Sequence, residues 1–116
     1  MDDEQDAREL IGNVLQDAGA DVDVAASAAD ALGLLQAGRY DVLVSDIGMP
    51  VEDGYSLLRR LRAIGSAQGR RTPALALTAY ASPQDRHRAL DAGFDLHLAK
   101  PVETGELVAA VARLAR

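Results

Sequence analysis

The 116-residue chain contains no cysteine and no tryptophan, and it has only one phenylalanine and three tyrosines. Without cysteine it forms neither a disulfide nor a thiolate metal site. With aromatic residues at 3% of the sequence, its core is expected to be aliphatic. No apolar run is long enough for a signal segment or a membrane span, which is typical of a cytoplasmic protein that does not bind a membrane.

Positive charge is also scarce. Twelve basic residues stand against 18 acidic ones, so the net charge is −6, and no block of Lys and Arg is long enough to follow a phosphate backbone. Direct binding to nucleic acid is therefore not expected. Lys100 is the single lysine of the sequence, which makes it conspicuous among eleven arginines.

The length fits one ordinary globular core, so residues 1–116 are expected to form a single domain. The sequence predicts five helices, four of them marked by apolar residues at helical spacing. These begin after Glu4, at a Ser27 capping box, around 57–64, at Ser82-Pro83 and at a Thr104 cap. The outer arginines of the third stretch, Arg59, Arg60 and Arg62, are expected to face solvent.

Between these helices the sequence predicts strands over 20–25, 42–45, 74–77 and 94–99. The first of them alternates in polarity, as a half-buried or edge strand does. Strands that alternate with helices of about ten residues indicate βαβ units with right-handed crossovers. The fold class is therefore α/β with a parallel sheet.

Three of the predicted strands end in a residue that can do chemistry: Asp46, Thr78 and Lys100. The carboxyl ends of parallel strands meet at one edge of the sheet, and that edge is where ligands bind in open α/β folds. An acid, a hydroxyl and a cation are expected to converge there. A capping role for Asp46 in its loop is the alternative that this stretch alone leaves open.

Asp2 and Asp3 precede the first helix and are expected at the same edge. A carboxylate cluster without His or Cys suits a hard cation with oxygen ligands, above all Mg²⁺, and Gly48 could add its backbone carbonyl. A lysine and a threonine hydroxyl would contact phosphoryl oxygens. Together these residues indicate phosphoryl chemistry on a carboxylate.

The order of five short motifs resembles the receiver domain of two-component response regulators, and the match covers nearly the whole chain. The motifs are Asp2-Asp3-Glu4, Asp46 with Met49-Pro50 and Asp53-Gly54, Leu77-Thr78-Ala79, Ala92-Gly93, and Lys100-Pro101. Five spaced motifs in order are far more specific than any one of them. The resemblance implies a flavodoxin-like, doubly wound parallel sheet with strand order 2-1-3-4-5.

The resemblance also implies a role for each site residue. Asp46 would be the phosphoacceptor that takes the phosphoryl group from a histidine kinase or phosphotransfer domain, Thr78 and Lys100 would bind that group, and Asp2, Asp3, Asp46 and the Gly48 carbonyl would hold Mg²⁺. Such a domain catalyses only its own phosphorylation and dephosphorylation. Pairing of two copies would use the fourth helix, last strand and fifth helix.

Two features depart from the family pattern. His97 occupies the position, three residues before the lysine, where receivers usually carry a Tyr or Phe that acts as a rotamer switch; the alternative is a surface histidine without a switching role. In addition, receivers have an apolar strand before the acidic pair, whereas here Met1 directly precedes Asp2. The first strand is therefore expected to be missing from a domain truncated at its N-terminus, and a hybrid sensor kinase is a reasonable source.

Other functions remain open at this point. A receiver-like domain could bind a partner without being phosphorylated. A phosphohydrolase with an aspartate nucleophile would usually have a second acid two residues after the first, where this chain has Gly48. A flavin-binding protein of similar fold would need a phosphate-cradling loop where this chain places carboxylates.

Overall fold

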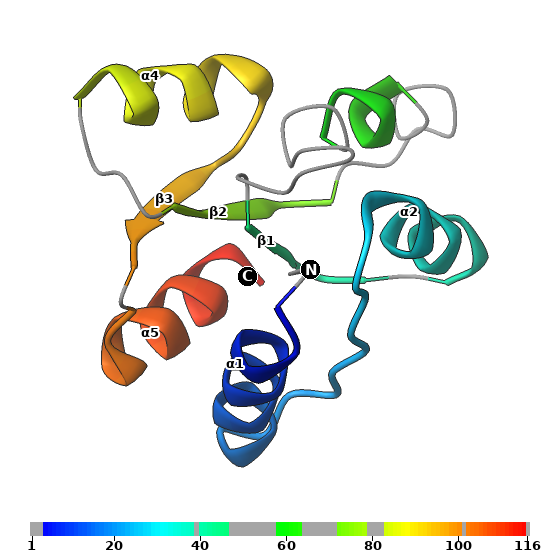
Figure 1. Cartoon of the computed structure of the whole chain (residues 1–116), viewed down its shortest axis with the longest axis vertical. Coiled ribbons are helices and arrows are strands. Elements are labelled where there is room, and N and C mark those ends of the chain that lie inside the picture. The colour runs from blue at the N-terminus through cyan, green and yellow to red at the C-terminus, as the bar shows by residue number, and fades with distance from the viewer. Residues whose placement is uncertain are drawn as a thin grey trace.

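The computed structural model describes residues 4–38, 40–46, 58–63, 72–78, 83–100 and 102–115. Figure 1 shows their arrangement around a small central sheet. The named elements are α1 (Gln5–Asp17), α2 (Ala28–Ala37), β1 (Leu43–Asp46), β2 (Ala74–Thr78), α4 (Pro83–Ala92), β3 (Leu96–Ala99) and α5 (Thr104–Leu114). Residues 58–63 are also helical.

The described sheet has three parallel strands in the order β1-β2-β3. Leu43 lies opposite Ala74 and Asp46 opposite Leu77, while Thr78 lies opposite Ala99. The strands predicted over 42–45, 74–77 and 94–99 are therefore confirmed, with small shifts at their ends. Their order agrees with the third to fifth strands of the predicted flavodoxin-like sheet.

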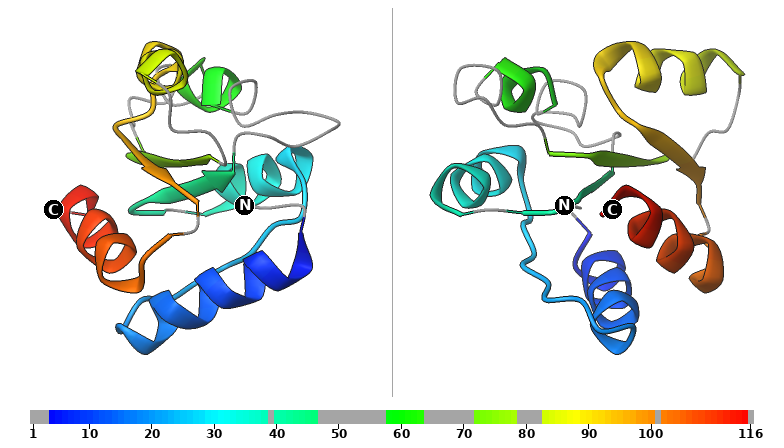
Figure 2. Two further views of the ribbon diagram at one scale, coloured as in Figure 1. Left: turned by 60° about the vertical axis from the view of Figure 1, so that its left-hand side comes forward. Right: turned by 180° about the vertical axis from the view of Figure 1, so that it is seen from behind.

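Helices cover both faces of this sheet (Figure 2). On one face α1 and α5 pack against the larger side chains of β2, Leu75 and Leu77. On the other face, where β2 presents Ala74 and Ala76, Leu58 of the third helix and Phe94 are buried. The small alanines let these bulkier side chains approach the strand, so both faces of β2 are closed to water.

Two predicted helix starts are confirmed. The Ser27 hydroxyl caps α2 by accepting a hydrogen bond from the Asp30 amide at 3.2 Å. Pro83 is the first residue of α4, and Gly93 ends that helix with a φ of 111°, a conformation that only glycine adopts easily. The Thr104 cap was wrong: Thr104 is the first helical residue of α5, and Glu103 precedes it as the N-cap.

The strand predicted over 20–25 was also wrong, because these residues are not part of the described sheet. They run beside α1, where an added Cβ at Gly12 would lie 3.5 Å from a methyl group of Val24. Between this segment and β1 lies a cavity of about 540 Å³. In the predicted order the first strand separates the second from the third, and among the described residues no strand lies between this segment and β1.

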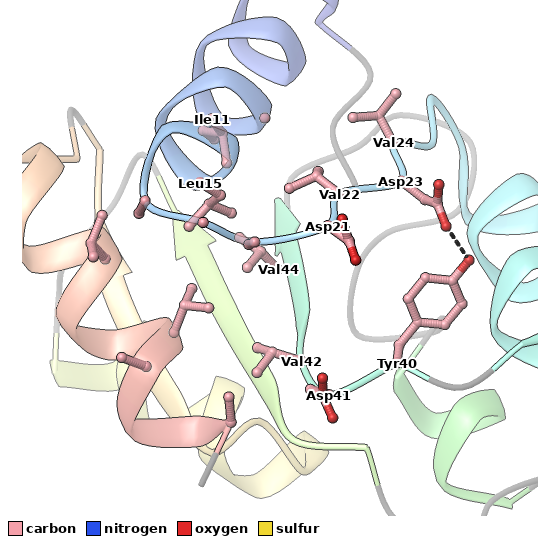
Figure 3. Close-up of a pocket in the computed structure, with 18 of the residues that line it drawn as sticks. Ile11, Leu15, Asp21, Val22, Asp23, Val24, Tyr40, Asp41, Val42 and Val44 are labelled. Atoms are coloured by element: carbon pink, nitrogen blue, oxygen red, sulfur yellow. Dashed lines mark hydrogen bonds between the residues drawn. The ribbon is translucent and has the colours of Figure 1, made fainter.

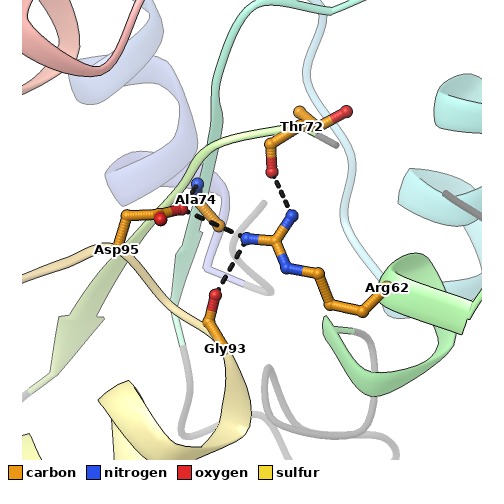
Figure 4. A network of polar contacts seen from close by, with 5 residues as sticks. All are labelled: Arg62, Thr72, Ala74, Gly93 and Asp95. Atoms are coloured by element: carbon orange, nitrogen blue, oxygen red, sulfur yellow. Dashed lines mark hydrogen bonds and ion pairs between the residues drawn. The ribbon is translucent and has the colours of Figure 1, made fainter. Parts of the chain in front are cut away.

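Arg62 does not face solvent as predicted (Figure 4). Its guanidinium donates to the carbonyls of Thr72 and Gly93, the latter at 2.8 Å, and lies 3.1 Å from the Asp95 carboxylate. The same carboxylate accepts a bond from the Ala74 amide at 2.8 Å. Arg62 therefore ties the third helix to the amino ends of β2 and β3, and only Arg59 and Arg60 of the three are exposed.

Charge is divided between the two helical layers. The layer of α1 and the segment after it carries mostly acids, among them Asp6, Glu9, Asp17, Asp21 and Asp23. The exposed side chains of the opposite layer include Arg59, Arg60, Arg86 and Arg88, together with the acids Asp30 and Asp91. None of the described helices combines the length and apolar character needed to cross a bilayer.

Candidate phosphoacceptor site

Asp46 is the last residue of β1, and its side chain is 13% exposed. The strand places it at the carboxyl edge of the sheet because Val44 and Ser45, the residues before it, are held in the ladder with β2. The Lys100 ammonium lies 3.2 Å from its Oδ2 atom. An acid and the single lysine of the sequence are thus paired at this edge, as predicted.

Lys100 is positioned by the backbone. Its amide donates to the Thr78 carbonyl at 2.7 Å, which continues the β2–β3 ladder one residue past Ala99. The side chain is 26% exposed, so part of it faces solvent. The three strand ends therefore bring Asp46, Thr78 and Lys100 together.

Thr78 is buried, with 5% of its surface exposed. It ends β2 between the strands that carry Asp46 and Lys100. A hydroxyl there can donate one hydrogen bond to an oxygen bound between the acid and the cation. The described part of the site consequently offers a carboxylate, a cation and a hydroxyl group.

In the β2–β3 ladder His97 lies opposite Ala76, and Ala99 lies opposite Thr78, two residues further along each strand. Since side chains alternate between the faces of a strand, His97 and Thr78 belong to the same face of the sheet. The ring is half-buried, and its Nε2 atom is shielded from solvent. Its switching role stays a prediction.

Asp2, Asp3 and Gly48 lie outside the described residues, so the expected Mg²⁺ ligands are only partly visible. Among the described residues no group of three or more His, Cys, Asp or Glu side chains is placed to share a metal ion. Asp46 is the predicted ligand that the structure describes, and its partly exposed carboxylate is the hard oxygen donor that Mg²⁺ prefers.

Sequence reasoning missed Ser45. It is completely buried, and its hydroxyl donates to the Asp46 carbonyl at 3.0 Å. The bond satisfies the hydroxyl and links it to the backbone of the acid next to it. A hydroxyl residue inside an otherwise aliphatic strand, immediately before the acid, was the signal available in the sequence.

Comparisons with known proteins point to one family. The family model "Response regulator receiver domain" matches residues 1–112. An uncharacterized 14.6 kDa protein of Leptolyngbya boryana is 45% identical over 108 residues, which are 93% of this chain and 81% of that protein. Hybrid signal transduction histidine kinase D of Dictyostelium discoideum is 38% identical over 113 residues, covering 92% of this chain but 7% of the kinase.

Among solved structures, chemotaxis protein CheY4 of Vibrio cholerae superposes with a TM-score of 0.89 at 33% identity, over 97% of this chain and 92% of that one. Relatives thus include both small proteins that the chain nearly spans and long kinases of which it spans a small part. Receiver domains of this kind generally bind Mg²⁺ and interact with histidine kinases or phosphotransfer domains. The chain belongs to the response regulator receiver domain family of two-component signal transduction.

Proposed function

We propose that Asp46 accepts a phosphoryl group from the phosphohistidine of a histidine kinase or phosphotransfer domain, and that the domain thereby switches an output surface. The observation that carries this proposal is the 3.2 Å contact between Lys100 and Asp46 beside the buried Thr78. Such a partner acts in the cytoplasm, which is where we place the domain.

In the proposed reaction a carboxylate oxygen of Asp46 attacks phosphorus, the bond from phosphorus to the histidine nitrogen breaks, and an acyl phosphate forms. The Lys100 ammonium would move its contact from the carboxylate to a phosphoryl oxygen and offset the added negative charge. The Thr78 hydroxyl would donate to a second phosphoryl oxygen. Water later hydrolyses the acyl phosphate and restores the carboxylate.

Mg²⁺ would be held by Asp46, Asp2, Asp3 and the Gly48 carbonyl. When bound, it supplies positive charge that neutralises phosphoryl oxygens and orients them for in-line displacement. Because Asp46 is the described member of this set, the proposal for the other three ligands depends on the sequence and on the family resemblance.

Incubation with acetyl phosphate and Mg²⁺ tests the proposed function by intact-mass spectrometry. We expect one phosphate-sized adduct that is absent in Asp46→Asn and is reduced when Mg²⁺ is chelated. Lys100→Met should slow its formation by about 100-fold, since removing one preorganised charge at a reacting centre costs on the order of 10²–10³ in rate.

Asp41→Asn is the matched control, because Asp41 is exposed beyond the opposite end of the same strand and should leave the adduct unchanged. Absence of an adduct in the unchanged chain would contradict phosphorylation and favour a receiver-like domain that only binds a partner.

Where two copies pair, we propose that they meet through α4, β3 and α5. Leu90 of α4 is 44% exposed and offers an apolar contact on this side of the molecule. Leu90→Glu should then raise the dissociation constant of the dimer, as measured by sedimentation with beryllofluoride present. An unchanged dimer would exclude this surface.

A further inference from the structure

Ser45 is a buried polar residue to which the proposed reaction assigns no role. None of its surface is exposed, and the residues before it in β1, Leu43 and Val44, are aliphatic. Val44 lines the cavity beside α1 (Figure 3). Because side chains alternate between the faces of a strand, Ser45 lies on the other face together with Leu43. Ser45 therefore belongs to the aliphatic face that packs against α2 and the third helix.

Packing alone does not explain a hydroxyl at this position. Across the sheet Ser45 lies opposite Ala76, and the cluster on this face consists of aliphatic side chains and Phe94. Moving a hydroxyl from water into such surroundings costs about as much free energy as one new hydrogen bond returns. Alanine or valine would fill the space without that cost. A role of the hydroxyl beyond stability is therefore worth testing.

The hydroxyl contacts the backbone of the proposed phosphoacceptor itself. Ser45 Oγ donates to the Asp46 carbonyl at 3.0 Å. The Leu43 amide donates to the Pro73 carbonyl, so the backbone groups of Leu43 and Ser45 point toward β2. Those of Val44 and Asp46 point to the other edge, because the direction of backbone groups alternates along a strand. The ladder with β2 therefore does not hold the Asp46 carbonyl, and the Ser45 hydroxyl does.

The orientation of this carbonyl affects how the Asp46 side chain leaves the backbone. Rotation about the Cα–C bond of Asp46 turns the carbonyl, and the backbone conformation of a residue restricts the rotamers of its side chain. The Asp46 carboxylate lies 3.2 Å from the Lys100 ammonium, so a different rotamer would separate the two groups. A fixed carbonyl is consequently a means of keeping the carboxylate beside the lysine.

We infer that Ser45 is a positioning residue for Asp46. Its hydroxyl fixes the Asp46 carbonyl, the fixed carbonyl limits the carboxylate to one rotamer, and that rotamer presents an oxygen beside Lys100 for attack on phosphorus. Ser45 itself contacts no phosphoryl group in this role. The consequence for the reaction rests on the proposed function of Asp46, whereas the effect on the rotamer is a property of the unphosphorylated chain.

Two substitutions of the same shape isolate the hydroxyl. Ser45→Thr retains it and Ser45→Val replaces it by a methyl group, so the effect of the added bulk is common to both. The three-bond couplings between the Hα and Hβ atoms of Asp46, measured by NMR without phosphodonor, report the rotamers of its side chain. We expect one rotamer in the unchanged chain and in Ser45→Thr, and couplings averaged over several rotamers in Ser45→Val.

Phosphorylation by acetyl phosphate and Mg²⁺ gives the second readout. Ser45→Val should lower the rate constant at saturating donor by about 5- to 10-fold relative to Ser45→Thr, which is the effect of one ordinary hydrogen bond. The donor concentration at half-maximal rate should not change, since Ser45 does not contact the donor. In urea Ser45→Val should be at least as stable as Ser45→Thr, because it buries no hydroxyl. A merely structural role would lower rate and stability together.

Leu43→Val is the matched control for a change in packing. Leu43 lies two residues before Ser45 on the same face of β1, is buried and carries no polar side-chain group. The substitution should lower stability in urea, because it removes buried methylene volume. It should leave the Asp46 couplings and the phosphorylation rate unchanged.

Equal Asp46 couplings in Ser45→Thr and Ser45→Val would overturn the inference. Equal phosphorylation rates of these two variants, in a chain that does react, would overturn it as well. Averaged couplings in Ser45→Val without an adduct in any variant or in the unchanged chain would support the positioning of Asp46 and reject the proposed function. The failure of the inference and the failure of the proposed function are therefore distinguishable.

Discussion

At the scale of single residues, Asp46 and Lys100 could be predicted and Arg62 could not. A buried strand that runs into an acid, and a lone lysine after another strand, are signals within a few consecutive residues. Arg62 appeared to belong to an outer face with Arg59 and Arg60. Its spacing of four residues from the buried Leu58 put it on the inner stripe, where its partners Gly93 and Asp95 come from distant sequence that helical periodicity does not reveal.

His97 carries a prediction at the same scale. It shares a sheet face with Thr78, and we expect its ring to change environment when a phosphoryl group draws the Thr78 hydroxyl toward Asp46. Beryllofluoride with Mg²⁺ supplies a stable mimic of the phosphoryl group. NMR should show the ring signals of His97 shifting together with the Thr78 amide.

His87 serves as the internal control, because its ring is 78% exposed on α4 and pairs with Asp91 of the same helix. Its ring signals should move little. A shifted Thr78 beside unmoved His97 signals would remove His97 from the switch.

At the scale of elements, local signals placed most helices and strands correctly. The Ser27 cap, Pro83 and Gly93 act on their own backbone, so their effect can be read from neighbouring residues. Residues 20–25 alternate in polarity as a strand does, yet a strand also needs a partner. The alternating pattern does not reveal whether a neighbouring strand is present, and the described residues contain no strand paired with this segment.

Gly93 gives a prediction for an element boundary. Its φ is 111°, and an added Cβ would lie 3.4 Å from both the Leu58 side chain and the Arg62 Nε atom. Gly93→Ala should therefore lower the free energy of unfolding by about 1–3 kcal/mol. Urea denaturation measures this change.

Gly33→Ala is the matched control, since Gly33 lies within α2 and an added Cβ would meet nothing within 4 Å. Alanine is the better helix former, so this variant should gain about 0.5–1 kcal/mol. If both alanines had the same effect, positive φ at Gly93 would not be the cause.

At the scale of the whole molecule, Tyr40 makes stability depend on pH. Its hydrogen bond to the Asp23 carboxylate raises the pKa of the phenol above 10.0, and burial and the negative charge of Asp23 act in the same direction. A group whose pKa is raised on folding stabilises the fold below its unfolded pKa. This contribution should therefore be present up to about pH 10 and disappear as pH rises through the higher folded value.

Urea midpoints measured between pH 8 and pH 11 check the Tyr40 prediction. The unchanged protein should lose more stability above pH 10 than Tyr40→Phe, which lacks the ionising hydroxyl. Tyr40→Phe and Asp23→Asn should follow similar curves, because either change removes the same charged contact. A wild-type curve parallel to that of Tyr40→Phe would show that the bond contributes nothing across this range.

The uneven distribution of acids and arginines between the two helical layers affects the electrostatic potential that an approaching protein meets. The molecule measures 35 × 33 × 27 Å, whereas the electrostatic screening length is about 10 Å at 0.1 M salt and about 30 Å at 0.01 M. In physiological salt a partner near the arginine layer therefore encounters local positive potential and little of the net charge of −6. In dilute buffer the screening length is comparable with the size of the molecule, so the negative potential of the acidic layer extends to the opposite side. Lowering the salt strengthens the attraction between an acidic partner and the arginine layer, but it also strengthens the repulsion by the net negative charge of the molecule. The rate of association should therefore rise less than the arginine layer alone would predict.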